Sequence, residues 1–137
     1  MLVTFPDGSR VRGSSLAERR ADDPDRGYGL YLDARWAPTW PAEVVEWHDF
    51  GLPADPQAAA AAIERAFGHA RAGELVEVGC AGGMGRTGTV LSCMAVLAGV
   101  PAPEAVSWVR STYRPEAVET DEQEAWVGWF AAWATGR

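Results

Sequence analysis

The sequence predicts one α/β domain over residues 1–137, with a small mixed or mostly parallel sheet flanked by helices. The length suits a single domain, since domains cluster at about 100–150 residues. Apolar residues alternate with strand periodicity in the N-terminal third and recur with helical periodicity after residue 55. A short apolar run at 74–78 then leads through a glycine-rich loop into a helix, an order of elements that is typical of parallel sheets.

The N-terminal third is expected to form four short strands, at residues 3–5, 9–12, 28–33 and 44–47. The first two flank the hairpin signal Pro6-Asp7-Gly8, and the third carries large apolar residues at alternate positions. The polar stretch 14–26 predicts a loop or a short helix, and the Trp- and Pro-rich stretch 36–41 predicts a link.

Four helices are expected in the rest of the chain, at residues 56–72, 87–98, 103–113 and 121–133, with a fifth strand at 74–78. Pro56 suits the first turn of the first helix, and Gly73 suits its C-terminal end. The last helix carries aromatic residues three and four positions apart. This spacing predicts that they pack in the core: Trp126, Trp129, Phe130 and Trp133.

The composition excludes several classes of protein. The net charge is −7 at pH 7, which argues against non-specific binding to nucleic acid. All 12 basic residues are arginines, which together with many alanines suggests a GC-rich bacterial gene. No apolar run is long enough to span a membrane and no signal peptide is expected, so a cytoplasmic protein is predicted. The two cysteines, Cys80 and Cys93, do not form a disulfide framework and are expected to be reduced.

Residues 79–88, Gly-Cys-Ala-Gly-Gly-Met-Gly-Arg-Thr-Gly, carry the strongest functional signal. Glycines at a helix N-terminus let successive N–H groups turn inward, which makes a binding site for phosphate or sulfate. The planar guanidinium of Arg86 can hold two oxygens of such an anion. The same N–H groups and the helix dipole favour the thiolate form of Cys80. The loop is therefore predicted to hold a nucleophile under a bound phosphoryl group.

Residues 83–88 also match the G-x-G-x-x-G pattern of dinucleotide-binding folds. Such a fold needs a second parallel strand about 20 residues further on, ending in an acidic residue. A helix is expected there, at 103–113, and this disfavours dinucleotide binding.

The spacing from Cys80 to Arg86, followed by Thr87 and Gly88, resembles the Cys-x5-Arg-Ser/Thr-Gly loop of the cysteine-dependent protein tyrosine phosphatases. The loop lies past the middle of the chain, as it does in the classical and dual-specificity branch of that superfamily. Together with the composition, this suggests a small bacterial member.

Two further segments resemble the same branch and occur in the same order. Residues 47–53 are similar to its Trp-Pro-Asp loop, with His48 in the position of the proline. Residues 119–123, followed by Trp126, are similar to its glutamine-rich loop, with Glu119 in place of the first glutamine.

The resemblance implies the phosphatase fold and hydrolysis of phosphomonoesters, above all phosphotyrosine in a protein or peptide, with inorganic phosphate as the product. Cys80 would form a cysteinyl-phosphate, Arg86 would clamp the phosphoryl oxygens, and Asp49 would be the general acid. Thr87 would donate its hydroxyl to the thiolate, and Gln123 would orient the hydrolytic water. No metal and no other cofactor is expected. The expected phosphate-binding residues are Ala81, Gly82, Gly83, Met84, Gly85 and Arg86.

Some positions depart from the family pattern or compete for a role. Gly79 stands where the family has a histidine that supports the hydrogen bonds of the loop. Asp33 and Asp55 are rivals of Asp49 for the acid, although Asp33 is also placed to cap a turn and Asp55 a helix. Cys93 lies about 10 Å along the helix that follows the loop, and it is expected in the core rather than paired with Cys80.

Three alternative functions stay open. The first is a dual-specificity or small-molecule phosphatase, because the chain is short for the tyrosine-recognition segment of the classical enzymes. Within this class, the lack of Lys or Arg inside the loop argues against an inositol polyphosphate substrate. The second is a catalytically silent phospho-binding module, suggested by Gly79 and His48. The third is a rhodanese-type sulfurtransferase, which the spacing from Cys80 to Arg86 disfavours.

Overall fold

The computed structural model describes residues 1–136, and its centre is a five-stranded sheet with the strand order β1-β2-β5-β3-β4. The strands are β1 (Leu2–Thr4), β2 (Arg10–Ser14), β3 (Arg26–Tyr31), β4 (Ala42–Val44) and β5 (Leu75–Gly79). β1 and β2 form the expected antiparallel hairpin, and every other neighbouring pair is parallel. The predicted mixed, mostly parallel sheet is therefore confirmed.

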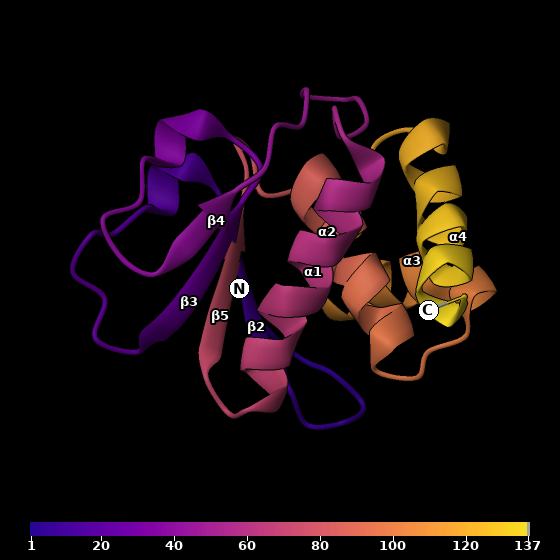
Figure 1. Ribbon diagram of the computed structural model, residues 1–137, viewed down its shortest axis with the longest axis horizontal. Coiled ribbons are helices and arrows are strands. Elements are labelled where there is room, and N and C mark those ends of the chain that lie inside the picture. The colour runs from indigo at the N-terminus through magenta and orange to yellow at the C-terminus, as the bar shows by residue number, and fades with distance from the viewer. Residues whose placement is uncertain (137) are drawn as a thin grey trace.

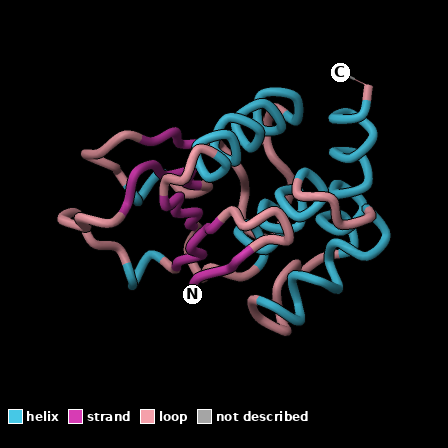
Figure 2. Tube along the Cα trace, turned by 90° about the horizontal axis from the view of Figure 1, so that it is seen from below, coloured by secondary structure: helices cyan, strands magenta, loops and turns pink. Residues whose placement is uncertain are grey.

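Four α-helices lie within the described residues: α1 (Pro56–Arg71), α2 (Gly85–Leu97), α3 (Ala102–Thr112) and α4 (Asp121–Thr135). Figure 1 shows all of them on one side of the sheet, with α3 and α4 farther from the strands than α1 and α2, and Figure 2 shows the same separation from below. α3 occupies the segment where a dinucleotide-binding fold would need a strand, so that alternative is excluded. None of the helices in residues 1–136 is long and apolar enough to cross a membrane.

The sequence placed two strands a few residues too late. The strand expected at 28–33 is β3, which ends at Tyr31, and the strand expected at 44–47 is β4, which ends at Val44. The reason is pairing, since Tyr31 pairs with Gly79 of β5 on one side and with Val44 on the other. Asp33 then turns the chain, because its side chain accepts a hydrogen bond from the Arg35 amide and caps a short 3-10 helix at Ala34–Trp36.

The helix signals read from the sequence are confirmed at the start of α1. The Asp55 carboxylate caps this helix by accepting from the Ala58 amide at 3.1 Å, and Pro56 occupies its first turn. The expectation for the aromatic residues of α4 is only partly right. Trp126 and Phe130 are buried, whereas Trp129 is 38% exposed. α4 lies at the outside of the helical layer, so one side of this helix faces solvent.

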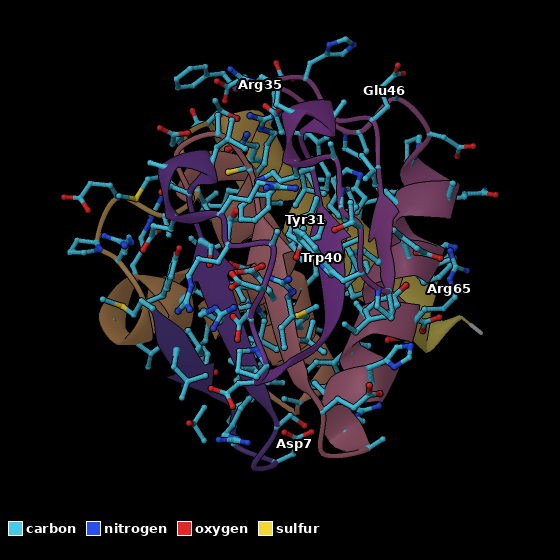
Figure 3. The ribbon with its side chains drawn as sticks, turned by 90° about the vertical axis from the view of Figure 1, so that its left-hand side faces the viewer. Asp7, Tyr31, Arg35, Trp40, Glu46 and Arg65 are labelled. Atoms are coloured by element: carbon cyan, nitrogen blue, oxygen red, sulfur yellow. The ribbon has the colours of Figure 1, made fainter. Side chains whose placement is uncertain are left out.

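The face of the sheet opposite to the helices is covered by residues 15–25 and 32–41, on either side of β3 in the chain, and holds a buried network of polar groups around Glu77 of β5. Figure 3 looks onto this face and shows Tyr31 and Trp40 together at its centre. The Tyr31 hydroxyl donates to Glu77 at 2.7 Å and accepts from the Trp40 indole at 2.8 Å. Arg12 and Arg26 form ion pairs with the same carboxylate, and the guanidinium of Arg26 lies 3.6 Å from the centre of the Trp40 ring.

Replacing Glu77 by Gln is expected to lower the free energy of unfolding by about 3–5 kcal/mol, because it leaves buried arginine charge without its partner. The Arg26 side chain is only 2% exposed, so water cannot replace the carboxylate. Urea unfolding monitored by tryptophan fluorescence measures the change. Glu43→Gln is the matched control, since its ion pair with Arg65 lies at the surface and is worth at most about 1 kcal/mol. Equal losses in the two variants would contradict the prediction.

Candidate active site

The loop singled out by the sequence lies at the carboxyl end of β5, where Cys80 directly follows Gly79, and it ends at the first residue of α2, Gly85. Gly83 has a φ of +71°, a backbone conformation that side-chain-bearing residues rarely adopt, so a glycine is needed there for the turn. No side chain within residues 1–136 caps the N-terminus of α2. The first amides of this helix are thus left to the loop and to an anion.

Three carbonyl groups of the loop accept hydrogen bonds from donors in other parts of the chain. The Trp36 indole donates to the Cys80 carbonyl at 3.0 Å, and the Leu16 amide donates to the Ala81 carbonyl at 2.9 Å. The Tyr113 hydroxyl donates to the Gly83 carbonyl at 2.6 Å. In a planar trans peptide the N–H points away from the preceding C=O. Carbonyls fixed on the outside therefore direct the amides that follow them toward the other side, as an anion-binding nest requires.

The sulfur of Cys80 accepts two hydrogen bonds inside this loop. The Gly83 amide lies 3.2 Å from Sγ, and the Thr87 hydroxyl lies 3.0 Å from it. Both Cys80 and Thr87 are buried. These two donors fix the position of the sulfur inside the loop.

Arg86 connects the loop to two other segments. Its Nη1 donates to the carbonyls of Leu32 and Trp47, each at 2.8 Å, and its Nη2 lies 3.2 Å from a carboxylate oxygen of Asp33. The side chain is 4% exposed, and its Nε is a buried donor with no partner among the described residues. A buried donor left unpaired costs about 1–3 kcal/mol, so an anion that accepts from Nε would relieve this cost.

Asp49 lies at the tip of the loop between β4 and α1, next to the guanidinium of Arg86. Its Oδ1 is 3.6 Å from Nη2 of Arg86, and its side chain is 53% exposed. The loop is held together by the Trp47 indole, which donates to the Gly51 carbonyl at 2.8 Å. Phe50 has a φ of +58° and is 61% exposed, so the loop presents an aromatic ring to solvent directly beside Asp49.

The rival carboxylates are engaged elsewhere. Hydrogen bonds from Arg35, assisted by Arg86, hold the pKa of Asp33 well below its usual range, so this carboxylate has no proton to give at neutral pH. Asp55 caps α1. Asp49 also lies beside Arg86 but, unlike Asp33, forms no ion pair with Arg35 among the described residues. It is therefore the better candidate for the acid.

Gln123 does not lie in the open, and both ends of its amide are used within the protein. Its Oε1 accepts from the amides of Glu119 and Thr120, and its Nε2 donates to the Gly51 carbonyl at 3.2 Å. The residue is fully buried. Its amide therefore ties the start of α4 to the loop that carries Asp49, whereas the expected contact with a hydrolytic water stays a prediction.

The segment before α4 also approaches the loop at residues 79–88. A Cβ placed on Gly85 would lie 3.0 Å from the carboxyl carbon of Glu119, so this side chain borders the loop. Val118 has a φ of +64°, which is strained for a β-branched residue, and Arg110 holds it there by donating to the carbonyls of Ala117 and Val118.

Gly79 has a structural explanation that the sequence did not provide. A Cβ at this position would lie 2.6 Å from Cε2 of the Trp36 indole. A histidine at position 79 would not fit without a shift of Trp36, because the indole fills the space that the side chain would need.

Cys93 lies in the core, fully buried in α2, and neither cysteine forms a disulfide. Burial raises the pKa of the Cys93 thiol. Within residues 1–136 there is no group of three or more His, Cys, Asp and Glu residues that could hold a metal ion.

Comparison with protein families gives a match over residues 53–127, which is more than half of the chain. The matching family is described as PTP-SAK: Swiss Army Knife protein, DSP-PTPase phosphatase domain. The chain belongs to this phosphatase family. The matched residues include both Cys80 and Arg86. The resemblance to the cysteine-dependent phosphatases is therefore confirmed.

Two relatives of this phosphatase domain come from Methanocaldococcus jannaschii, the uncharacterized proteins MJECL20 and MJ0215. They are 36% and 35% identical to it over 109 residues, which is 72% of this chain and 71% and 66% of the respective relatives. The chain thus spans slightly less than two thirds of the second relative. Both relatives are archaeal, so the bacterial origin suggested by the composition stays a prediction.

Solved structures share the fold of this phosphatase domain at low sequence identity. Kinase associated phosphatase (KAP), with its catalytic site cysteine replaced by serine, has a TM-score of 0.74 and 12% identity, covering 100% of this chain and 97% of its own. Human DUSP28 has a TM-score of 0.70 and 17% identity, covering 99% of each chain. Tk-PTP in the active form has a TM-score of 0.66 and 23% identity, covering 95% and 96%. The phosphatase fold expected from the sequence is confirmed.

Several residues of the site were missed in the sequence. Trp36 and Tyr113 hold loop carbonyls, and Leu32 and Trp47 hold Arg86 through their own carbonyls. The glycine at position 79 was the one available signal, since a missing side chain beside a predicted nucleophile indicates that another residue occupies its space.

Iodoacetate at pH 6 is expected to alkylate Cys80 at least about tenfold faster than Cys93, and inorganic phosphate is expected to protect Cys80. The Gly83 and Thr87 donors hold the Cys80 sulfur inside the loop, whereas burial raises the pKa of the Cys93 thiol. Mass spectrometry of peptides from samples treated with and without phosphate measures both rates. Equal rates at the two cysteines would show that the loop does not activate Cys80.

Proposed function

We propose that this protein hydrolyses phosphomonoesters, with phosphotyrosine in a protein or peptide as the substrate, through a cysteinyl-phosphate at Cys80. The observation that carries the proposal is the buried Nε of Arg86, which has no partner among the described residues and lies next to a loop with three carbonyls held by donors from other segments. A tetrahedral oxyanion could accept from Nε and from the loop amides together. The two hydrogen bonds to the Cys80 sulfur support its role as nucleophile.

In the first step the Cys80 thiolate attacks phosphorus and forms the S–P bond, while the bond from phosphorus to the tyrosine oxygen breaks. Asp49 gives its proton to that oxygen as it leaves. Arg86 and the loop amides stabilise the charge on the three remaining phosphoryl oxygens. Thr87 and the Gly83 amide, which hold the sulfur, set its position for attack.

In the second step a water attacks the cysteinyl-phosphate, and the carboxylate of Asp49 takes a proton from that water. The S–P bond breaks, inorganic phosphate forms and the Cys80 thiolate is restored. The same carboxyl group thus serves as acid and then as base, so no cofactor is needed to balance the reaction. Gln123 contributes by holding Gly51, two residues from Asp49.

Two features support phosphotyrosine over an aliphatic phosphate. The exposed ring of Phe50 stands beside Asp49, where it could stack on an aryl group. A cavity of about 430 Å³ borders Arg86 and Asp49 and is lined by both apolar and charged residues. Its charged members are Asp33, Glu46, Asp49 and Arg86, so the cavity next to Arg86 carries more acidic than basic side chains.

This acidic surrounding disfavours a polyanionic headgroup as substrate. PTPMT1 in complex with PI(5)P has a similar fold, with a TM-score of 0.63 and 14% identity, but that likeness concerns the fold. Glu46 and Asp49, which line the cavity next to Arg86, would repel extra phosphates of such a lipid that entered it. Dual specificity and small-molecule substrates remain alternatives, as does binding without turnover.

The proposal is tested by measuring turnover of an aryl phosphate and of phosphotyrosine, phosphoserine and phosphothreonine peptides of otherwise identical sequence. We expect kcat/KM to be highest for the phosphotyrosine peptide. Equal values on all three peptides would favour dual specificity. Binding of phosphate with no turnover of any ester would favour a silent phospho-binding module, and sulfur transfer from thiosulfate would favour a sulfurtransferase.

A further inference from the structure

The indole of Trp36 is completely buried and makes contact with the residue proposed as nucleophile. Its Nε1 donates a hydrogen bond of 3.0 Å to the Cys80 carbonyl, across 44 positions of sequence. One face of the ring stacks on Tyr31, with the centroids 4.4 Å apart and an angle of 18° between the planes. The edge of the ring lies against the backbone of Gly79.

Residues 36 and 79 compete for the same space. A Cβ at position 79 would lie 2.6 Å from Cε2 of the indole, closer than real Cβ atoms come to other groups, and 3.0 Å from Nε1. The indole cannot move aside easily, because one of its faces stacks on Tyr31. The Tyr31 hydroxyl is itself hydrogen-bonded to Glu77 and to Trp40 in the buried network. Gly79 therefore leaves room for an indole that supports the loop from a different element.

The same short helix also positions Arg86. Asp33 caps the 3-10 helix at Ala34–Trp36, and the carboxylate of Asp33 lies 3.2 Å from Nη2 of Arg86. Trp36 ends this helix, and its own amide donates to the Asp33 carbonyl at 3.1 Å. One turn of chain after β3 thus holds both ends of the phosphate-binding loop, the Cys80 end through Trp36 and the Arg86 end through Asp33.

We propose that Trp36 is a positioning residue for the nucleophile: its indole N–H holds the Cys80 carbonyl outward, so that the Ala81 amide and the Cys80 sulfur keep their places in the anion-binding loop. This inference rests on the proposed function in taking Cys80 as the nucleophile. The trans peptide between residues 80 and 81 couples the two groups, because an outward carbonyl requires an N–H that points the opposite way. The hydrogen bond also offsets the negative end of a carbonyl dipole next to the thiolate.

Trp36→Phe tests the inference, because it removes the donor and keeps most of the ring that stacks on Tyr31. The rate of Cys80 alkylation by neutral iodoacetamide is measured from pH 5 to pH 9 and corrected for the folded fraction. We expect the half-maximal rate to move to higher pH and the rate at pH 6 to fall about tenfold, in line with the loss of one buried hydrogen bond. We also expect kcat for an aryl phosphate to fall more than KM changes.

Trp40→Phe is the matched control. It removes an indole N–H on the same face of the sheet, and Trp40, like Trp36, contacts Tyr31, to whose hydroxyl it donates. It is expected to lower the melting temperature and to leave the alkylation profile unchanged. A wild-type profile in Trp36→Phe, or the same shift in both variants, would overturn the inference.

Gly79→Ala approaches the same contact from the other side, and its methyl group is expected to displace the indole and to shift the profile in the same direction. If Trp36→Phe does not fold, the result for Gly79→Ala decides, and an unchanged profile there overturns the inference. Alkylation does not depend on turnover. A shifted profile in a protein that hydrolyses no phosphate ester would therefore contradict the proposed function and leave the role of Trp36 standing.

Discussion

Replacing Cys80 by Ser is expected to lower the hydrolysis of aryl phosphate by more than about a thousandfold while binding of inorganic phosphate survives. A hydroxyl at this position is a far weaker nucleophile than the thiolate, and the loop offers Ser no base to activate it. Binding is expected to persist because the loop amides and Arg86 do not depend on the sulfur. Turnover by steady-state kinetics and phosphate affinity by calorimetry give the two quantities.

The matched control for this prediction is Cys93→Ser, a change of the same atoms at a cysteine that is buried in the core and away from the loop. This control is expected to lose stability, since it buries a hydroxyl among apolar groups, and to keep its turnover when corrected for the folded fraction. Retained turnover in Cys80→Ser would remove the covalent mechanism. Loss of phosphate binding in the same variant would show that the sulfur, rather than the loop, holds the anion.

Replacing Asp49 by Asn is expected to lower kcat/KM for a phosphotyrosine peptide by about 10²–10⁴-fold, the usual contribution of a general acid. The effect on a nitrophenyl phosphate is expected to be much smaller, because nitrophenolate leaves without a proton. The alkaline limb of the pH profile should flatten in the variant. In the wild type that limb reflects deprotonation of the acid, and an amide has no such proton to lose.

The structure decides which control is suitable. Asp55→Asn is expected to stay near wild type, because Asn caps a helix as well as Asp does. Asp33→Asn is not a neutral control, since its carboxylate lies 3.2 Å from Arg86 and keeps that guanidinium in place. If Asp49→Asn is neutral on both substrates, the acid must be another group, although the assignment of Cys80 and Arg86 could still hold.

The local features of the fold could be predicted because their causes lie within a few residues of one another. The Asp55 and Pro56 signals mark the start of α1 through a cap that spans three residues. The hairpin of β1 and β2 follows from its turn, and the loop at 79–88 follows from its glycines and from the helix behind it. The ends of β3 and β4 were misplaced because pairing with β5, rather than the alternation of apolar residues, decides where these strands stop.

The sequence by itself determined the phosphatase family, the loop with Cys80 and Arg86, and Asp49 as the leading candidate for the acid, because each is carried by a short run of residues. Only the tertiary structure decided how the loop is held. Trp36 and Tyr113 reach it across 44 and 30 positions, and a hydrogen bond between such distant residues leaves no pattern in one sequence. Likewise, Gly79 reads as a missing side chain until the fold places an indole against it. The chemistry of the site is thus local in the chain, whereas its geometry depends on contacts that exist only after folding.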